Sequence, residues 1–137
     1  MMKLVIDESL CTGCRCCELA CSGRRVNEFA PARARVRIRS SREKHGSFIS
    51  VCVQCAEEGC VAACSQGAIA RDPADGIVKI DYDLCTECMA CVDACPYDAM
   101  SVDVVTGLPI KCDLCGGDPE CVQFCRPQAL TFILSQD

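Results

Sequence analysis

The sequence predicts a small α+β fold in which short strands and short helices surround groups of closely spaced cysteines. Seventeen of the 137 residues are cysteine, whereas tryptophan is absent and only four Phe and two Tyr are present. The cysteines gather in four runs, and the residues around the runs repeat at fixed offsets. A chain with so few large apolar side chains needs crosslinks or metal centres to hold a folded core.

Each run combines three closely spaced cysteines with a fourth, and three residues separate the fourth cysteine from the third. The third run reads C-x2-C-x2-C-x3-C-P from Cys85 to Pro96, and the first run has the same cysteine spacing. The second and fourth runs have longer middle gaps. This spacing is typical of 4Fe-4S clusters, in which the fourth cysteine binds the other cluster of a pair. The sequence therefore predicts four 4Fe-4S clusters, with these ligands: Cys11, Cys14, Cys17, Cys21, Cys52, Cys55, Cys60, Cys64, Cys85, Cys88, Cys91, Cys95, Cys112, Cys115, Cys121 and Cys125.

Disulfides and zinc sites are the two alternatives to iron–sulfur clusters, and one of the seventeen cysteines lies outside the predicted ligands. Disulfides are disfavoured by the odd cysteine count and by an N-terminus without an apolar signal region or twin arginine. A zinc site normally uses two C-x2-C pairs that a longer loop separates, whereas here a third cysteine follows after two residues. Cys17 rather than Cys16 restores the spacing of the third run, so Cys16 is expected to be a small buried hydrophobe.

The same order of strand, cysteine loop, short helix and strand is expected in each module. The stretch 6–11 (IDESLC) recurs at 80–85 (IDYDLC), and Ala plus a large apolar residue follow three of the runs at 68–69, 99–100 and 129–130. These offsets indicate four copies of one unit. Strands are expected at 3–10, 47–51, 77–80 and within 101–110, and a last strand at 129–134 should pair with the first.

Residues 32–39 alternate between small or apolar residues and arginine (ARARVRIR). Period two predicts a strand with one buried face, while the other face presents four guanidinium groups. The charge either protects a solvated edge strand from aggregation or offers a docking surface for an acidic partner. His45, in the next polar turn, is expected to be solvated rather than a metal ligand.

Charge is divided unevenly along the sequence. Residues 1–47 carry a net charge of +5, and residues 48–137 carry −10, which gives the total of −5. Such asymmetry favours oriented docking to partners, and the basic half of one copy on the acidic half of the next could build oligomers or filaments. No aromatic residues accompany the basic stretch, so nucleic-acid binding is not expected. No segment is apolar enough to span a membrane, and a cytoplasmic location is expected.

The residues alone do not decide which cysteine runs share a pair of clusters. The sequence repeats favour pairing the first run with the second, whereas the short separation between the second and third runs favours pairing those two. Residues 52–95 by themselves resemble a small two-cluster ferredoxin. The whole chain, by its order of compact, expanded, compact and expanded runs and by its basic strand, resembles the four-cluster ferredoxin subunits of molybdenum and tungsten oxidoreductases. These are the beta subunits of the dimethyl sulfoxide reductase family and the small subunits of formate hydrogenlyase and tungsten aldehyde oxidoreductases.

This resemblance implies two ferredoxin-like double-cluster modules. The outer module would comprise residues 1–47 with 101–137, and the inner module residues 48–100. The implied ligand sets are Cys11, Cys14, Cys17 and Cys125 for cluster 1; Cys112, Cys115, Cys121 and Cys21 for cluster 2; Cys52, Cys55, Cys60 and Cys95 for cluster 3; and Cys85, Cys88, Cys91 and Cys64 for cluster 4.

The expected function is electron transfer rather than catalysis, since no nucleophile, general base or open metal site is visible in the sequence. The resemblance implies a partner with a tungsten or molybdenum pterin, and a flavin subunit or a soluble ferredoxin at the other end of the series of clusters. The alternative is a free, diffusible polyferredoxin.

Overall fold

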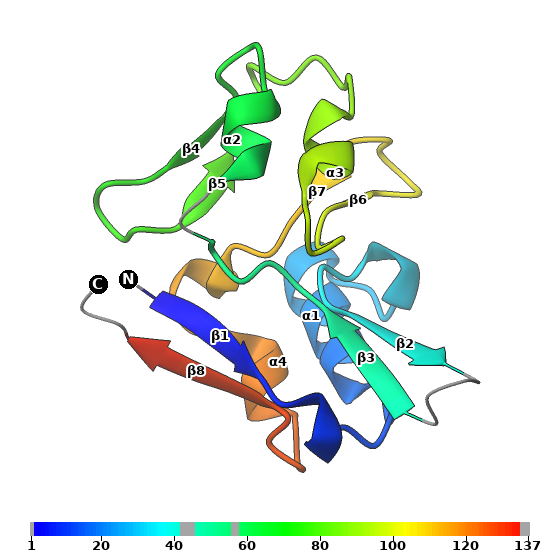
Figure 1. The fold of residues 1–137 in the computed structure, drawn as a ribbon. Helices are drawn as coiled ribbons and strands as arrows, with labels where there is room; N and C mark the ends of the chain where they lie inside the picture. The colour runs from blue at the N-terminus through cyan, green and yellow to red at the C-terminus, as the bar shows by residue number, and fades with distance from the viewer. Residues whose placement is uncertain (1, 42–45, 56–57, 135–137) are drawn as a thin grey trace.

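The computed structural model describes residues 2–41, 46–55 and 58–134, and it shows two lobes joined side by side (Figure 1). His45 lies outside the described residues, so its expected solvation stays a prediction. The prediction of a small α+β fold with hairpins and short helices is confirmed. No helix in the described part of the protein is long and apolar enough to cross a membrane.

The first lobe contains the beginning and the end of the described residues. Its elements are β1 (Met2–Ile6), η1 (Glu8–Leu10), α1 (Cys16–Val26), η2 (Pro31–Arg33), β2 (Arg37–Ser41), β3 (Gly46–Ser50), η3 (Leu114–Gly116), α4 (Glu120–Gln123) and β8 (Leu130–Leu134). β1 and β8 pair antiparallel, from Met2 opposite Leu134 to Ile6 opposite Leu130, as the sequence predicts. β2 and β3 form a second antiparallel hairpin, and α1 packs beside α4 (Figure 1).

The second lobe contains shorter elements. They are α2 (Gly59–Ala63), β4 (Ile69–Arg71), β5 (Val78–Ile80), α3 (Ala90–Ala94), β6 (Ser101–Val102) and β7 (Pro109–Ile110). β4 pairs with β5 and β6 with β7, both antiparallel, and the helices α2 and α3 lie against each other. The β4–β5 turn is closed by Asp72, whose backbone N–H donates to the Ile77 carbonyl over 2.9 Å. Each lobe thus repeats the predicted order of loop, short helix and strand.

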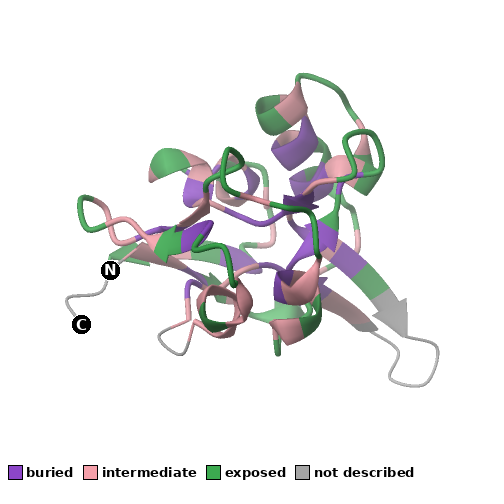
Figure 2. Ribbon diagram, turned by 90° about the horizontal axis from the view of Figure 1, so that it is seen from above, coloured by how far each residue is buried: buried purple, intermediate pink, exposed green. Residues whose placement is uncertain are grey.

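Buried side chains form two separate cores (Figure 2). The larger one, in the first lobe, consists of Leu4, Ala34, Val36, Ile38, Ile49, Val51, Ile77, Leu114, Ala129 and Leu130 with Cys17, Cys21, Cys112 and Cys121. The smaller one, in the second lobe, consists of Ile69, Val78, Cys91 and Met100. Cysteines make up part of both cores, which agrees with the expectation that cysteine chemistry replaces a conventional apolar interior.

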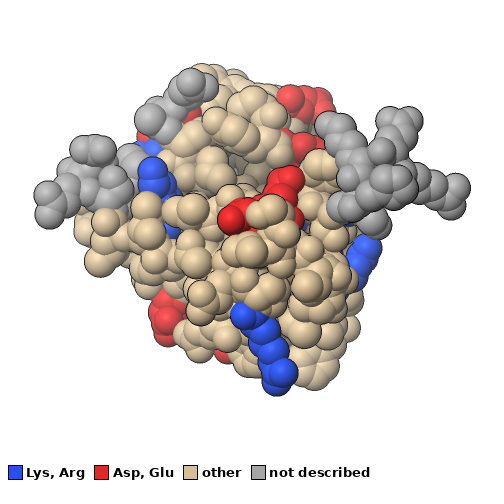
Figure 3. All heavy atoms as spheres, turned by 60° about the horizontal axis from the view of Figure 1, so that its bottom comes forward, with Lys and Arg blue, Asp and Glu red and all other residues tan. Residues whose placement is uncertain are grey.

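The basic stretch 32–39 is only partly the strand that its alternation predicts. Ala34, Val36 and Ile38 are buried, so the predicted buried face is confirmed. However, the strand begins only at Arg37, because Pro31 opens a 3-10 turn. The prediction that four guanidinium groups form one exposed face is wrong for Arg33, which is 13% exposed and pairs with Asp103, whereas Arg39 is exposed and pairs with the exposed Asp98 over 2.6 Å. On the face drawn in Figure 3, Lys and Arg form separate patches rather than one band.

Candidate metal centres

Four cysteines from distant parts of the sequence line a cavity in the first lobe. Cys21 comes from α1, whereas Cys112, Cys115 and Cys121 come from the loop before η3, from η3 and from α4. The packing of α1 on α4 therefore joins the first cysteine run to the fourth.

A second set of four cysteines lines a cavity in the other lobe. Cys64 follows α2, while Cys85, Cys88 and Cys91 belong to the loop that enters α3 and to its first turn. Ile69 and Ile80, from the two strands of the β4–β5 hairpin, complete its wall. This set joins the second cysteine run to the third.

The remaining eight predicted ligands are placed in two further groups. Cys125 and Cys14 lie close enough to Cys17 for their charges to raise its pKa, and Cys11 packs against the larger core beside them. In the other lobe, Cys52 and Cys55 have the same effect on the pKa of Cys60. Cys60 and Cys95 both pack against the smaller core.

The backbone of the cysteine loops directs N–H groups at the sulfurs. The Ala68 and Ala99 amides donate to Cys64 Sγ and Cys95 Sγ over 3.3 and 3.4 Å. These are the alanines that recur four residues after the run, so the sequence repeat marks a repeated hydrogen bond. The N–H of Ala68 lowers the pKa of Cys64. Such donors also stabilise negative charge on a cluster and tune its reduction potential.

Three cysteine loops enter their helices through a residue in the left-handed region. The φ angle is 62° at Arg15 before α1, 47° at Glu58 before α2 and 65° at Met89 before α3. This conformation is costly for residues other than glycine, by about 1 kcal/mol or more each. Its recurrence at one position of three modules indicates that the loop geometry is imposed by what the cysteines hold.

Burial dominates the ionisation of several thiols. It raises the pKa of Cys17 and of Cys112 to about 12, and it raises the pKa of Cys121 further. These thiols are therefore protonated at neutral pH in the metal-free protein. Metal binding requires the thiolates, so cluster insertion releases protons and stabilises the fold at the same time.

The donor set fits iron–sulfur clusters. All sixteen groups are thiols, which favour Fe–S clusters among the metal centres of proteins. Four thiols around one cavity suit a cube that takes one thiolate at each iron. Within residues 2–41, 46–55 and 58–134, no three His, Cys, Asp or Glu side chains are arranged around a single metal ion.

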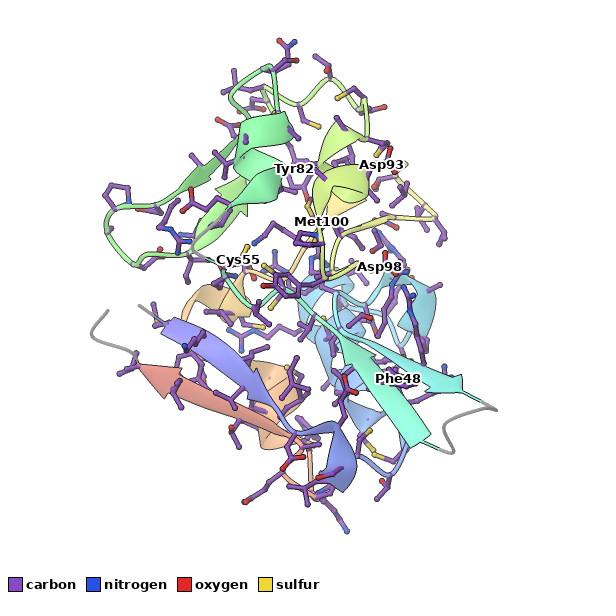
Figure 4. The ribbon with its side chains drawn as sticks, viewed as in Figure 1. Phe48, Cys55, Tyr82, Asp93, Asp98 and Met100 are labelled. Atoms are coloured by element: carbon purple, nitrogen blue, oxygen red, sulfur yellow. The ribbon has the colours of Figure 1, made fainter. Side chains whose placement is uncertain are left out.

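The two lobes meet at thiols of adjacent sites. Cys52, from the second run, lies close enough to Cys112, from the fourth run, to raise its pKa. Within the first lobe, Cys17 has the same effect on Cys121. Cys55, Met100 and Asp98 lie near the boundary between the lobes in Figure 4. Neighbouring thiols therefore form a series that runs through the first lobe to the boundary with the second.

Polar residues that carry no sequence signal hold this boundary together. The buried Gln54 amide donates to the Cys112 carbonyl over 3.0 Å and accepts from the Val78 N–H over 2.8 Å. Arg71, on β4, donates to the Cys55 carbonyl over 2.8 Å and to Glu58 over 2.5 Å. These hydrogen bonds hold the loop of the second run against β4. A single Gln or Arg outside any motif gives no hint of such a role, and sequence reasoning missed both.

Cys16 was expected to be buried, and this expectation is wrong. Its side chain is exposed, whereas that of Cys17 is buried. Both residues lie in the first turn of α1, whose buried residues Cys17, Glu18, Cys21 and Ser22 recur with helical spacing. Cys16 falls one position outside this face, so it points away from the core.

Comparisons with known proteins agree with this arrangement. The family model of the 4Fe-4S dicluster domain matches residues 45–134. The B subunit of polysulfide reductase from Wolinella succinogenes is 36% identical over 94% of this protein and 74% of its own length. Protein NrfC of Escherichia coli strain K12 is 40% identical over 94% of this protein, which spans 63% of NrfC. The polyferredoxin-like subunit of an aliphatic sulfonate oxidoreductase from Pyrococcus furiosus is 35% identical over 90% of this protein and 70% of its own length.

A solved structure shows the same fold. It is the active site complex BamBC of benzoyl coenzyme A reductase with benzoyl-CoA, in which the matching subunit is 26% identical and has a TM-score of 0.54 over 97% of this protein and 79% of its own length. The cysteine spacing, the two thiol-lined cavities, the family match and the relatives point to one conclusion. The chain belongs to the 4Fe-4S dicluster domain family of iron–sulfur electron-transfer subunits.

Proposed function

We propose that this protein conducts electrons through four 4Fe-4S clusters between the catalytic subunit of an oxidoreductase and a second redox partner. The observation that carries the proposal is that four thiols line a cavity in each lobe, and that a series of neighbouring thiols runs from Cys17 through Cys121 and Cys112 to Cys52 at the boundary. A binding protein for a single metal would not need such a series. When bound, each cluster takes up and releases one electron.

The proposed ligand sets are those implied by the family resemblance. Cluster 1 is bound by Cys11, Cys14, Cys17 and Cys125; cluster 2 by Cys112, Cys115, Cys121 and Cys21; cluster 3 by Cys52, Cys55, Cys60 and Cys95; and cluster 4 by Cys85, Cys88, Cys91 and Cys64. Support comes from the two cavities, each lined by the four cysteines of one set, and from the mutual effects of thiols in the other two sets. The outer and inner modules, residues 1–47 with 101–137 and residues 48–100, are part of the same proposal.

The proposed catalytic partner is a tungsten or molybdenum pterin subunit, and the proposed location is the cytoplasm. The support for the partner is the resemblance of all four runs to ferredoxin subunits of such enzymes, together with relatives named as parts of a polysulfide reductase and an aliphatic sulfonate oxidoreductase. A flavin subunit or soluble ferredoxin would serve as the other electron partner.

The first test is the native mass and metal content of the assembly purified without oxygen. A large complex with tungsten or molybdenum, and about sixteen irons per copy of this protein beyond the partner's own, is the expected result. A brown protein near its own mass of 14.8 kDa would instead favour the diffusible polyferredoxin.

The second test interrupts the series of clusters. Replacing Cys88 by serine removes one thiolate from the cavity shared with Cys64, Cys85 and Cys91, so cluster 4 should be lost or converted and electron flow through the complex should fall. Cys16→Ser is the matched control, because it removes an exposed thiol outside the four sets. Unchanged turnover of the Cys88→Ser complex would contradict a linear path.

A further inference from the structure

Lys111 is a buried lysine at the boundary between the lobes. Only 4% of the residue is exposed. Its ammonium donates hydrogen bonds to the Val78 carbonyl and, over 2.7 Å, to the Cys112 carbonyl. Val78 also donates its N–H to Gln54, which in turn bonds Cys112. The lysine is therefore fixed between the loop of the fourth cysteine run and the β4–β5 hairpin.

The charge of Lys111 has no carboxylate partner among the described residues. The ion pairs of this region use other groups: Lys79 pairs with Asp72 and Asp75, and Arg25 pairs with Asp113. Two carbonyl oxygens accept from two of the three N–H groups of the ammonium but leave its positive charge uncompensated. A buried charge without a counter-ion is strongly unfavourable, so a negative group is needed nearby.

Thiols of two different proposed sites lie beside this charge. The Lys111 ammonium donates to the backbone of Cys112 over 2.7 Å, and it lies close enough to the Cys60 and Cys112 sulfurs to attract negative charge on either. Cys60 belongs to the proposed cluster 3, and Cys112 to the proposed cluster 2. The negative charge that Lys111 faces is therefore that of the two cluster sites on either side of the boundary.

We propose that Lys111 is the shared counter-charge of clusters 2 and 3 and raises the reduction potential of both. The inference rests on the proposed cluster assignment. A 4Fe-4S cluster with its four thiolates carries a charge of about −2, and one-electron reduction adds one more negative charge. A fixed positive charge stabilises the reduced form more than the oxidised form. Lys111 thus eases the passage of an electron across the boundary between the two modules.

The test is a potentiometric titration of the anaerobically purified protein with dithionite, followed by electron paramagnetic resonance. Lys111→Met keeps the length of the side chain and removes its charge, whereas Lys111→Arg keeps the charge. Lys79→Met is the matched control, because Lys79 is 39% exposed and already pairs with Asp72 and Asp75.

The expected result is selective. At a fixed potential, the ratio of reduced to oxidised cluster in Lys111→Met falls about tenfold for two of the four clusters, which equals about 59 mV for a one-electron couple. The reduction potentials of the other two clusters in Lys111→Met should not change. All four potentials in Lys111→Arg and in Lys79→Met should stay close to those of the unaltered protein. Full iron content in Lys111→Met with unchanged potentials would overturn the inference.

Iron content separates this inference from the proposed function. Fewer than four clusters in the unaltered protein would refute the cluster assignment itself. Loss of iron from Lys111→Met but not from Lys111→Arg would show that the clusters need the charge, which supports the counter-charge role. Equal loss of iron from both variants would mean that the shape of the lysine matters rather than its charge, and would overturn the proposal.

Discussion

Replacing Asp103 by asparagine is expected to destabilise the protein because it breaks a buried ion pair between distant segments. Asp103 Oδ1 and Oδ2 accept from Arg33 Nε and Nη2 over 2.9 and 3.0 Å, and the two side chains are only 6% and 13% exposed. The pair joins η2 to the turn between β6 and β7, and Asp103 also accepts from Val105 N and Thr106 Oγ1 within that turn.

The pKa of Asp103 gives the magnitude. The Arg33 hydrogen bonds lower the pKa of this carboxyl from 3.8 to about 2, against the opposing effect of burial. A shift of nearly two pKa units corresponds to at most about 2–3 kcal/mol of stability. Because the pKa is lower in the fold, this contribution is complete above about pH 4 and is lost as the pH falls through about 2. Measurements at pH 7 therefore capture all of it.

The assay is an anaerobic thermal melt at pH 7, followed by the loss of cluster absorbance. For a protein of this size, about 2 kcal/mol should lower the transition by roughly 6 °C. Asp98→Asn is the matched control: its contact with Arg39 is shorter, at 2.6 Å, but the side chains are 62% and 47% exposed. Exposed pairs contribute about 0–1 kcal/mol. Equal decreases in the two variants would refute the argument that burial, rather than distance, decides the strength of the pair.

Three further changes test other parts of the structure. Gln54→Leu should lower the same thermal transition by several degrees, since it leaves the buried Cys112 carbonyl with one donor fewer at a cost of about 1–3 kcal/mol; an unchanged melt would show that the lobes do not depend on this bond. Cys16→Ser should keep full iron content, whereas Cys17→Ser should lose one cluster, and the reverse result in iron content would exchange their roles. Gly13→Ala should lower iron content, because φ is +74° and the added Cβ would lie 3.1 Å from a side-chain oxygen; full occupancy would mean that the loop can relax.

Sequence spacing predicted the fold class and several of its elements well because these depend on local patterns. The strand pairing of β1 with β8 follows from the repeated module, and the burial of Ala34, Val36 and Ile38 follows from their alternation. What the sequence could not predict are contacts between distant segments. Arg33 looked like one of four equivalent arginines, yet its partner Asp103 lies 70 residues away.

Lys111 and Gln54 show the same limit at the boundary between the lobes. A lone lysine or glutamine outside a motif is usually exposed, and neither stands in a periodic pattern. One signal was present for Lys111: it directly follows the apolar stretch Leu108-Pro109-Ile110 and precedes a cysteine. A charged residue in such a position is worth considering as buried when a metal centre follows it.

The pairing of β1 with β8 has a consequence for biosynthesis. Met2 lies opposite Leu134, and Cys17 lies near Cys125, so the first lobe needs segments from both ends of the described residues. The second lobe, in contrast, is built from one continuous stretch between β3 and β7. During translation its cysteines are complete while the first lobe still lacks α4 and β8. Contacts between residues close in sequence form faster than those that close long loops. The second lobe should therefore fold before the first, in which β1 and β8 pair only after a long loop closes.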